Sequence, residues 1–227
     1  MDFILDAVEA RLLGCLIEKE RTTPEYYPLT LNALISACNQ KSNRDPEMHL
    51  DEATVARSLD ALRLKGLAYL NHTAGGRVPK HAHQLEKFWT FSTQELGILC
   101  LLLLRGPQTA GELRSRAGRL CEFANPAEVE TVLQELVTRP GGPFVVKLPR
   151  QPGQSAARHA HLFCGPVEGA QPPAPASAET PTPTTAPADA GRVSALEQEV
   201  AALRAELEEL KRQLGISVSA EPPAPEG

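Results

Sequence analysis

The residues best suited to binding chemistry form one polar run, Asn39 to Arg44, with the sequence NQKSNR. Amide and guanidinium groups read base edges and grip phosphates, and they also hydrogen-bond to protein partners. The alternative role is structural, because such side chains also satisfy free backbone groups at helix ends. Both roles can hold at once, and we expect Lys41 and Arg44 to point outward.

A second set of candidates lies on the helix expected over residues 52–65 and on the hairpin that follows it. Four polar residues of this helix are expected off its buried face: Thr54, Arg57, Ser58 and Lys65. In a winged helix this element often enters the major groove of DNA. Arg63, Arg77 and Lys80 would then contact phosphates. For reading specific bases we favour an ordinary solvated face, since nearby acidic residues dilute the charge.

The most basic patch of the chain falls between residues 105 and 119. Its members are Arg105, Arg114, Arg116 and Arg119. Three of these arginines lie within six residues, on and just after a short expected helix. Such a density of guanidinium groups favours contact with phosphate or with an acidic protein surface.

Two His-Ala-His triplets, 81–83 and 159–161, have the spacing that places two imidazoles on one face of a strand, where they could bind a metal. Neither triplet has an acidic or cysteine partner at a recognisable metal spacing, so a repeated structural role is favoured. The sequence lacks a glycine-rich phosphate loop, a nucleophile elbow and a paired-carboxylate motif. Cys15 and Cys38 occupy apolar helix positions. We therefore expect no enzymatic activity, no metal and no cofactor.

Helical periodicity and capping residues place the first candidates on three helices and a hairpin. The helices are expected at residues 7–20, 31–38 and 52–65, behind the capping side chains Asp6, Thr30 and Asp51. Extended runs at 67–71 and 77–85 flank Gly75-Gly76 and predict a β-hairpin. Three helices followed by a hairpin are typical of a winged helix-turn-helix domain, expected over residues 1–90.

The same order of elements recurs in residues 91–164. Capping residues are expected at Ser92, Thr109 and Asn125, and the two strands at 144–148 and 158–163. Several positions repeat at constant offsets: Pro28, Thr30, Leu34 and Ser36 with Pro107, Thr109, Leu113 and Ser115, then Val55, Leu59 and Leu62 with Val129, Leu133 and Leu136. The fold is therefore predicted to be mainly α with small β-hairpins, in two tandem winged helix-turn-helix domains.

The C-terminal residues have a different character. Residues 165–191 are rich in proline, alanine and threonine, which predicts a disordered linker. In residues 192–215 apolar side chains from Val193 to Leu214 alternate spacings of three and four, the pattern of a coiled coil, and residues 216–227 are expected to be a disordered tail. Valine at the first a positions, leucine at d and complementary flanking charges favour a parallel homodimer.

Composition argues against two broad classes of protein. The formal net charge of −5 is concentrated in residues 166–227, which hold ten acidic and four basic side chains, so the remainder is nearly neutral. A dedicated nucleic-acid binder would be strongly basic. The longest apolar run, residues 96–104, is too short to span a membrane. The first residues do not form a signal peptide, and five cysteines without a C-x-x-C pair are typical of a cytoplasmic protein.

Two long phrases identify a resemblance. GCLIEKERTTPEYYPLTLNALISACNQKSNRDP and LLLRGPQTAGELRSRAGRL closely resemble the YceH-like family of uncharacterised bacterial proteins. The resemblance covers about residues 5–163. It implies a tandem winged-helix fold and a cytosolic protein, and it implies no established activity.

Two functions fit these expectations. The first is a dimeric DNA-associated regulator that binds duplex DNA through the third helix, the wing and the arginines of the second domain. The second is an adaptor that uses the same modules to bind a protein partner. The near-neutral charge favours the adaptor and the commonest use of the fold favours DNA, which we rank first by a narrow margin.

Overall fold

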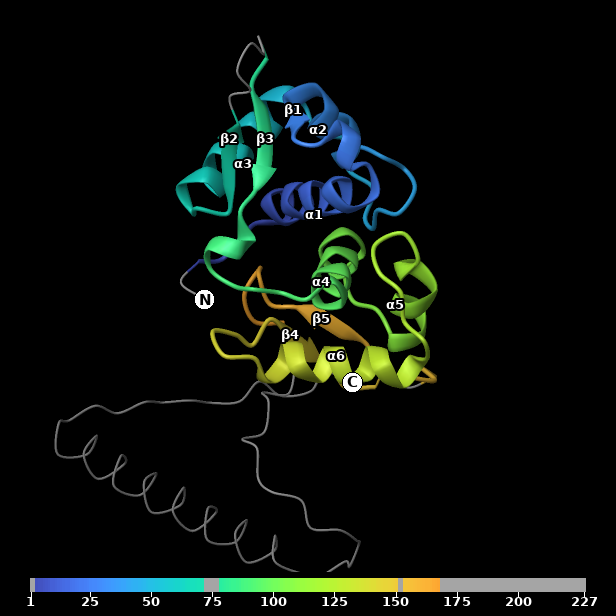
Figure 1. Ribbon diagram of the computed structural model, residues 1–227. Helices are drawn as coiled ribbons and strands as arrows, with labels where there is room; N and C mark the ends of the chain where they lie inside the picture. Colours follow the sequence, from blue (N-terminus) through green and yellow to red (C-terminus); the bar gives the residue numbers. More distant parts are fainter. Residues whose placement is uncertain (1–2, 72–77, 151–152, 168–227) are drawn as a thin grey trace, which may run out of the picture. The chain divides into compact units, whose positions relative to one another are not determined.

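The computed structural model describes residues 3–71, 78–150 and 153–167 (Figure 1). Within these ranges the chain is mainly helical, with six α-helices and two small antiparallel sheets. The predicted coiled coil and tail lie outside the described residues, as does all of the predicted linker beyond residue 167.

The first half of the chain contains three helices and a three-stranded sheet. Its elements are α1 (Ala7–Thr22), η1 (Pro24–Tyr26), β1 (Leu29–Thr30), α2 (Leu31–Cys38), α3 (Glu52–Leu64), β2 (Ala68–Asn71), β3 (Lys80–His83) and η2 (Leu85–Lys87). The sheet has the order β1-β3-β2, so β3 is central. The predicted helices and hairpin are confirmed. Strand β1 was not predicted, because two residues are too short to show a strand period.

The second half repeats this order. Its elements are α4 (Thr93–Arg105), α5 (Ala110–Ala117), α6 (Pro126–Thr138), β4 (Val145–Lys147) and β5 (His159–His161). Helices α2 and α5 have 8 residues each, and α3 and α6 have 13 each. The backbones of Gln108 and His159 exchange hydrogen bonds of 3.0 and 2.7 Å, as β1 pairs with β3 in the first half. Both strands of the second hairpin are shorter than predicted.

Capping side chains set the helix starts as predicted. Asp6 accepts hydrogen bonds from the backbone of Val8 and Glu9, and the Glu9 carboxylate accepts one from the Asp6 backbone N–H at 2.8 Å. The other caps are Thr30, Asp51, Ser92, Thr109 and Asn125, each of which accepts a backbone N–H three residues later. These bonds satisfy donors that the first helical turn leaves free.

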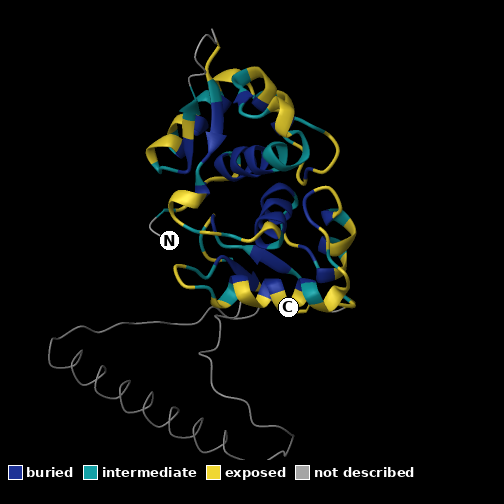
Figure 2. Cartoon of the chain, in the orientation of Figure 1, coloured by how far each residue is buried: buried dark blue, intermediate teal, exposed yellow. Residues whose placement is uncertain are grey.

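Helices α1 and α4 lie at the centre of one hydrophobic core that both halves share (Figure 2). Residues 9–17 of α1 and 95–104 of α4 are buried on all sides. The helices approach closely at Gly14, where an added Cβ would lie 2.8 Å from Leu104 Cδ2. The Cys100 thiol donates to the Gly14 carbonyl at 3.5 Å. The predicted apolar run is therefore a buried helix, and no helix in the described part of the chain is long and apolar enough to cross a membrane.

We expect Gly14→Ala to lower the free energy of unfolding by about 1–3 kcal/mol, because the new methyl group overpacks the contact with Leu104. Gly111→Ala is the matched control. Its position in α5 is exposed and the nearest atom to a new Cβ lies 4.0 Å away, so helix propensity should make it neutral or stabilising by up to about 1 kcal/mol. Urea unfolding of both variants measures the difference. Equal stabilisation by the two variants would contradict the close packing of α1 against α4 at Gly14.

Candidate functional site

The polar run is held to α1 by a buried arginine. Arg44 is only 5% exposed, and its Nη2 and Nη1 donate to the two carboxylate oxygens of Glu18 at 2.6 and 3.0 Å. Its Nε donates to the Ala37 carbonyl at 3.1 Å. Burial opposes both charges, but this bidentate pair outweighs burial: it lowers the pKa of Glu18 and raises the pKa of Arg44. The prediction that Arg44 points outward is wrong, because its partner lies on another helix.

A second buried arginine completes the anchoring of this segment. Arg11 of α1 donates to the carbonyls of Cys38 at 3.1 Å and Pro46 at 2.6 Å. The Asn39 side chain donates to the Leu50 carbonyl and accepts the Leu50 N–H, both at 2.8 Å. For Arg44 and Asn39 the capping role is therefore confirmed. Lys41, in contrast, is exposed.

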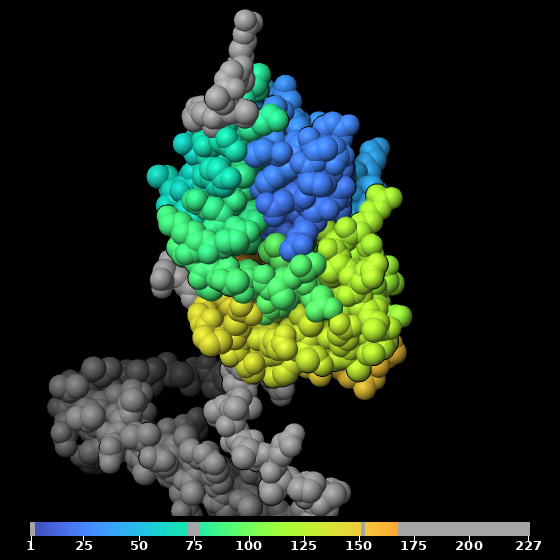
Figure 3. All heavy atoms as spheres, viewed as in Figure 1, coloured from blue at the N-terminus to red at the C-terminus, as the bar shows by residue number. Residues whose placement is uncertain are grey.

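The polar run and the arginines of the second half meet around one pocket of about 430 Å³. Figure 3 shows the light-blue atoms of the 39–46 segment beside the yellow-green atoms of the α5 region. The pocket is lined by Glu18, Lys19, Thr22, Gln40, Lys41, Ser42, Asn43, Leu101, Leu104, Arg116, Arg119 and Leu120. Of the predicted site residues, Lys41, Arg116 and Arg119 are thus brought together, although Lys41 is far from the other two in sequence.

The cations on the second-half side are positioned by polar neighbours. Arg116 donates to Gln108 Oε1 at 2.7 Å, and the buried Gln108 amide donates in turn to the Leu101 carbonyl at 3.0 Å. Arg105 donates to Asn43 Oδ1 at 2.8 Å, across the two halves. Burial and the positive charge of Arg116 lower the pKa of Arg105. Arg116 also lies 3.5 Å from a carboxylate oxygen of Glu112, so the net positive charge of this junction comes mainly from Lys41, Arg105 and Arg119.

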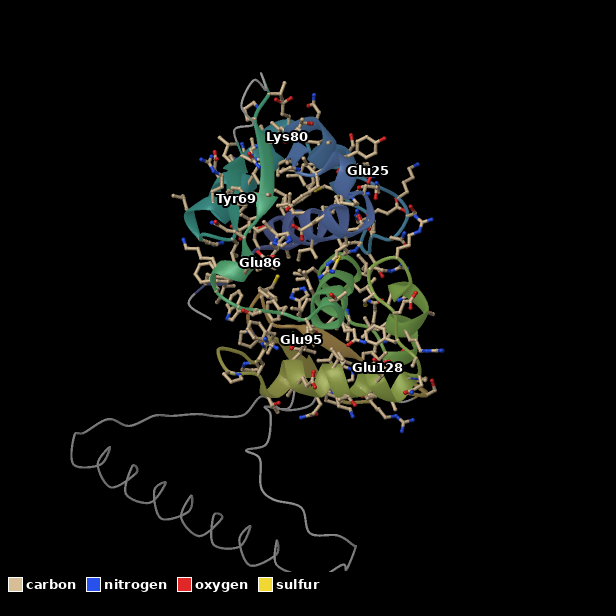
Figure 4. The ribbon with its side chains drawn as sticks, in the orientation of Figure 1. Glu25, Tyr69, Lys80, Glu86, Glu95 and Glu128 are labelled. Atoms are coloured by element: carbon tan, nitrogen blue, oxygen red, sulfur yellow. The ribbon has the colours of Figure 1, made fainter. Side chains whose placement is uncertain are left out.

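The remaining predicted residues lie elsewhere. Arg114 is exposed on α5 and donates to the Ala124 carbonyl at 3.3 Å, and Arg57 is exposed on α3 beside Thr54. Lys80 lies on β3 (Figure 4), and Arg77 is outside the described residues. Figure 1 places α3 and α5 on opposite sides of the central helices.

Two expectations about α3 need correction. Ser58 is buried, at 8% exposure, because it faces inward next to the core residue Leu59. Lys65 is half-buried, and its Nζ lies 2.5 Å from a carboxylate oxygen of the buried Glu9. Neither residue is free to contact DNA as predicted. Both errors arise because the partners of these side chains come from other elements.

The exposed faces of α3 and α6 carry little net positive charge. On α3, Arg57 and Arg63 are balanced by Glu52 and Asp60, and Arg63 pairs with Asp60 at 2.9 Å. On α6 the exposed residues are Pro126, Ala127, Glu130, Thr131, Gln134, Glu135 and Thr138. An acidic face repels phosphate. The exposed face of α6 therefore offers no positive charge to phosphate.

The histidines of the two triplets are buried, apart from the half-buried His161. His83 Nε2 lies 2.9 Å from Glu20, and its Nδ1 lies 3.9 Å from Glu86. The two carboxylates thus lie at opposite edges of one ring, and Nδ1 also accepts the Leu85 N–H at 3.5 Å. Glu20, His83 and Glu86 lie close enough together that they could hold a metal ion, which the sequence spacing did not suggest. In the second half, burial lowers the pKa of His159 and lowers that of His161 to about 4.

An exposed apolar surface lies where α3 ends and β2 begins, and sequence reasoning missed it. Leu64 is 90% exposed and Tyr69 41% exposed (Figure 4). They border a shallow depression of about 640 Å³ that is lined by Asp60, Arg63, Leu64, Ala68, Tyr69, Leu70 and Gln84. The helical period of α3 places Leu64 on the solvent-facing side of the helix. An apolar residue at such a position is the signal in the sequence that could have revealed this surface.

Comparison with known proteins finds relatives whose names state no activity. Residues 5–154 match the family described as a protein of unknown function, DUF480. The chain is 52% identical over 212 residues to a UPF0502 protein of Pelobacter propionicus, covering 93% of this chain and 95% of that protein. It is 48% identical over 218 residues to one of Aeromonas hydrophila, covering 94% and 98%. A match of that extent continues beyond residue 163, where the sequence resemblance was expected to end.

We expect Arg44→Met to lower the free energy of unfolding by about 3–5 kcal/mol at pH 7.5, because it leaves the Glu18 carboxylate buried without its partner. The double variant Arg44→Met/Glu18→Met should recover a large part of this loss. Denaturant unfolding of the three proteins measures both effects.

The stabilities of the wild type and of Arg44→Met should respond differently to pH. In the native protein the pKa of Glu18 is lowered. Its contribution to the free energy of unfolding is therefore complete above the ordinary pKa of a glutamate, and it is lost as the pH falls through the pKa of Glu18 in the folded state. In Arg44→Met, burial opposes the Glu18 charge and only Lys19, at 3.4 Å, still favours it, so the variant's loss of stability relative to the wild type should shrink between pH 7.5 and 5. If the variant instead lost stability in parallel with the wild type, the buried pair would not be the origin of the effect.

Proposed function

The chain belongs to the bacterial DUF480 family of proteins of unknown function, and we propose that it is a non-enzymatic adaptor built from two winged helix-turn-helix units. The winged-helix assignment is supported by the order of three helices and a hairpin in each half. The apolar surface formed by Leu64 and Tyr69 carries the proposal of protein binding. In this proposal the heptads of residues 193–214 form a homodimer.

Strand β2 offers the partner a backbone edge. It is an outer strand of the β1-β3-β2 sheet, and it pairs with β3 through Ala68↔His83 and Leu70↔His81. The Gln84 N–H donates to the Leu67 carbonyl, so by alternation the backbone groups of Ala68 and Leu70 face away from β3. Ala68 is only 2% exposed and its carbonyl accepts the Gln84 side-chain N–H at 3.4 Å, so an extended peptide that adds to this edge would hydrogen-bond to Leu70 and place apolar side chains against Leu64.

Charge on this surface fits a protein better than DNA. Arg63 and Asp60 neutralise one another next to Leu64. Interfaces between proteins are enriched in aromatic residues and arginine, whereas DNA-binding surfaces need an excess of positive charge. The partner we propose is therefore an extended, predominantly apolar segment without a strong net charge.

A photo-crosslinking amino acid at Tyr69 tests the adaptor role in cells. We expect a discrete protein adduct from position 69 and none from position 134, a matched exposed site on α6. Adding Leu64→Asp should abolish the adduct, because a buried carboxylate would oppose docking. In the purified adduct, the Leu70 amide should exchange more slowly with solvent. Equal labelling from both positions would contradict a specific partner at β2.

A DNA-associated regulator is the second candidate, and the gathering of basic residues around α5 favours it. Lys41, Arg114 and Arg119 are exposed in this region, and Arg105 and Arg116 are half-buried beside them. Binding through them would be driven by phosphate contacts, because the exposed faces of α3 and α6 offer little for reading bases.

For that candidate we expect affinity for duplex DNA to fall steeply with salt, with a logarithmic slope of about −0.9 for each phosphate neutralised. Replacing Arg114, Arg116 and Arg119 together by alanine should flatten the slope and weaken binding to all sequences alike. Arg57→Ala, on the opposite side, is the control and should leave the slope unchanged. Fluorescence anisotropy at several salt concentrations decides the question. No affinity of the wild type at low salt would exclude DNA.

A further inference from the structure

We propose that the pocket between the two halves binds a small phosphorylated molecule of about the size of a nucleoside monophosphate. Its volume of about 430 Å³ lies in the range of small-molecule sites. One wall comes from α1 and residues 40–43, and the other comes from α4, α5 and residues 119–120. The ligand would therefore contact both copies of the repeated unit.

The lining has an excess of positive charge. Lys19, Lys41, Arg116 and Arg119 line the pocket, and Glu18 is the only carboxylate among its lining residues. Both oxygens of Glu18 are already occupied by the buried Arg44, and one also lies 3.4 Å from Lys19. Within the described ranges, Lys41 and Arg119 make no ion pair. An anion would supply the missing countercharge.

The donors are held in place before a ligand arrives. Gln108 fixes the guanidinium of Arg116, and Gln108 is itself fixed by the Leu101 carbonyl. Arg44 donates to Gln40 Oε1 at 3.0 Å, which leaves the Gln40 NH₂ group as a donor toward the pocket. Donors that need no rearrangement lose less entropy on binding. Planar guanidinium groups also match the geometry of phosphate oxygens.

The remaining lining is apolar. Leu101, Leu104 and Leu120 are almost fully buried residues that nevertheless border the pocket. A ligand that consisted of phosphate alone would leave this surface in contact with water. A phosphate joined to a flat, weakly polar body such as a nucleobase would satisfy the cations and cover the leucines at once.

Isothermal titration calorimetry of the full-length chain with AMP, inorganic phosphate and adenosine tests the proposal. We expect AMP to bind more tightly than phosphate and adenosine to bind least. The double variant Arg116→Gln/Arg119→Gln should weaken AMP binding tenfold or more, because it loses charge-assisted hydrogen bonds from both positions. Arg114→Gln is the matched control, since Arg114 lies on the same helix but does not line the pocket. Thermal unfolding checks that each variant is folded.

Four outcomes would overturn the proposal. Equal binding of AMP and phosphate would remove the role of the leucines, and equal binding of AMP and adenosine would remove that of the cations. An equal loss in Arg114→Gln would indicate a diffuse electrostatic effect. Binding of duplex DNA through Arg116 and Arg119, with no AMP binding at millimolar concentration, would assign these cations to a nucleic acid instead.

Discussion

The bidentate pair between Arg44 and Glu18 is the interaction on which the polar segment depends. Without it, residues 39–46 would be a surface loop with few apolar contacts. Ordering such a loop costs conformational entropy, about 1–2 kcal/mol for each backbone residue fixed. The pair offsets this cost together with the bonds that Arg44 and Arg11 donate to four backbone carbonyls. Arg44 therefore builds the wall that presents Lys41 rather than contacting a ligand itself.

The two halves repeat the same elements but contribute different chemistry. The first half has a long segment of thirteen residues between its second and third helices, anchored from α1. The second half has a shorter connection and places its arginines on and just after α5. Neither half contains the pocket alone, because each supplies one wall. The pocket therefore depends on the differences between the two halves, and a single copy could not form it.

Local signals were enough to predict the helices and their starts. The six capping residues act on backbone groups only two or three positions away, so their pattern is visible in the sequence. The errors concern contacts between distant residues. Arg44 and Glu18 are 26 positions apart, and Lys65 and Glu9 are 56 apart. No sequence period reports such pairs, so a buried arginine was taken for an exposed one. The pocket was missed for the same reason.

The close packing of α1 against α4 also has a consequence for biosynthesis. Helix α1 ends at Thr22 and α4 at Arg105, so α4 is completed about 83 residues later, which at 5–20 residues per second is a delay of roughly 4–17 s. During that time the apolar surface of α1 that α4 later covers has no native partner. The nascent first half therefore exposes apolar surface until its copy has been synthesised, even though its own helices are short and locally encoded. Each repeated unit thus completes its core, like the pocket, only when its copy is present.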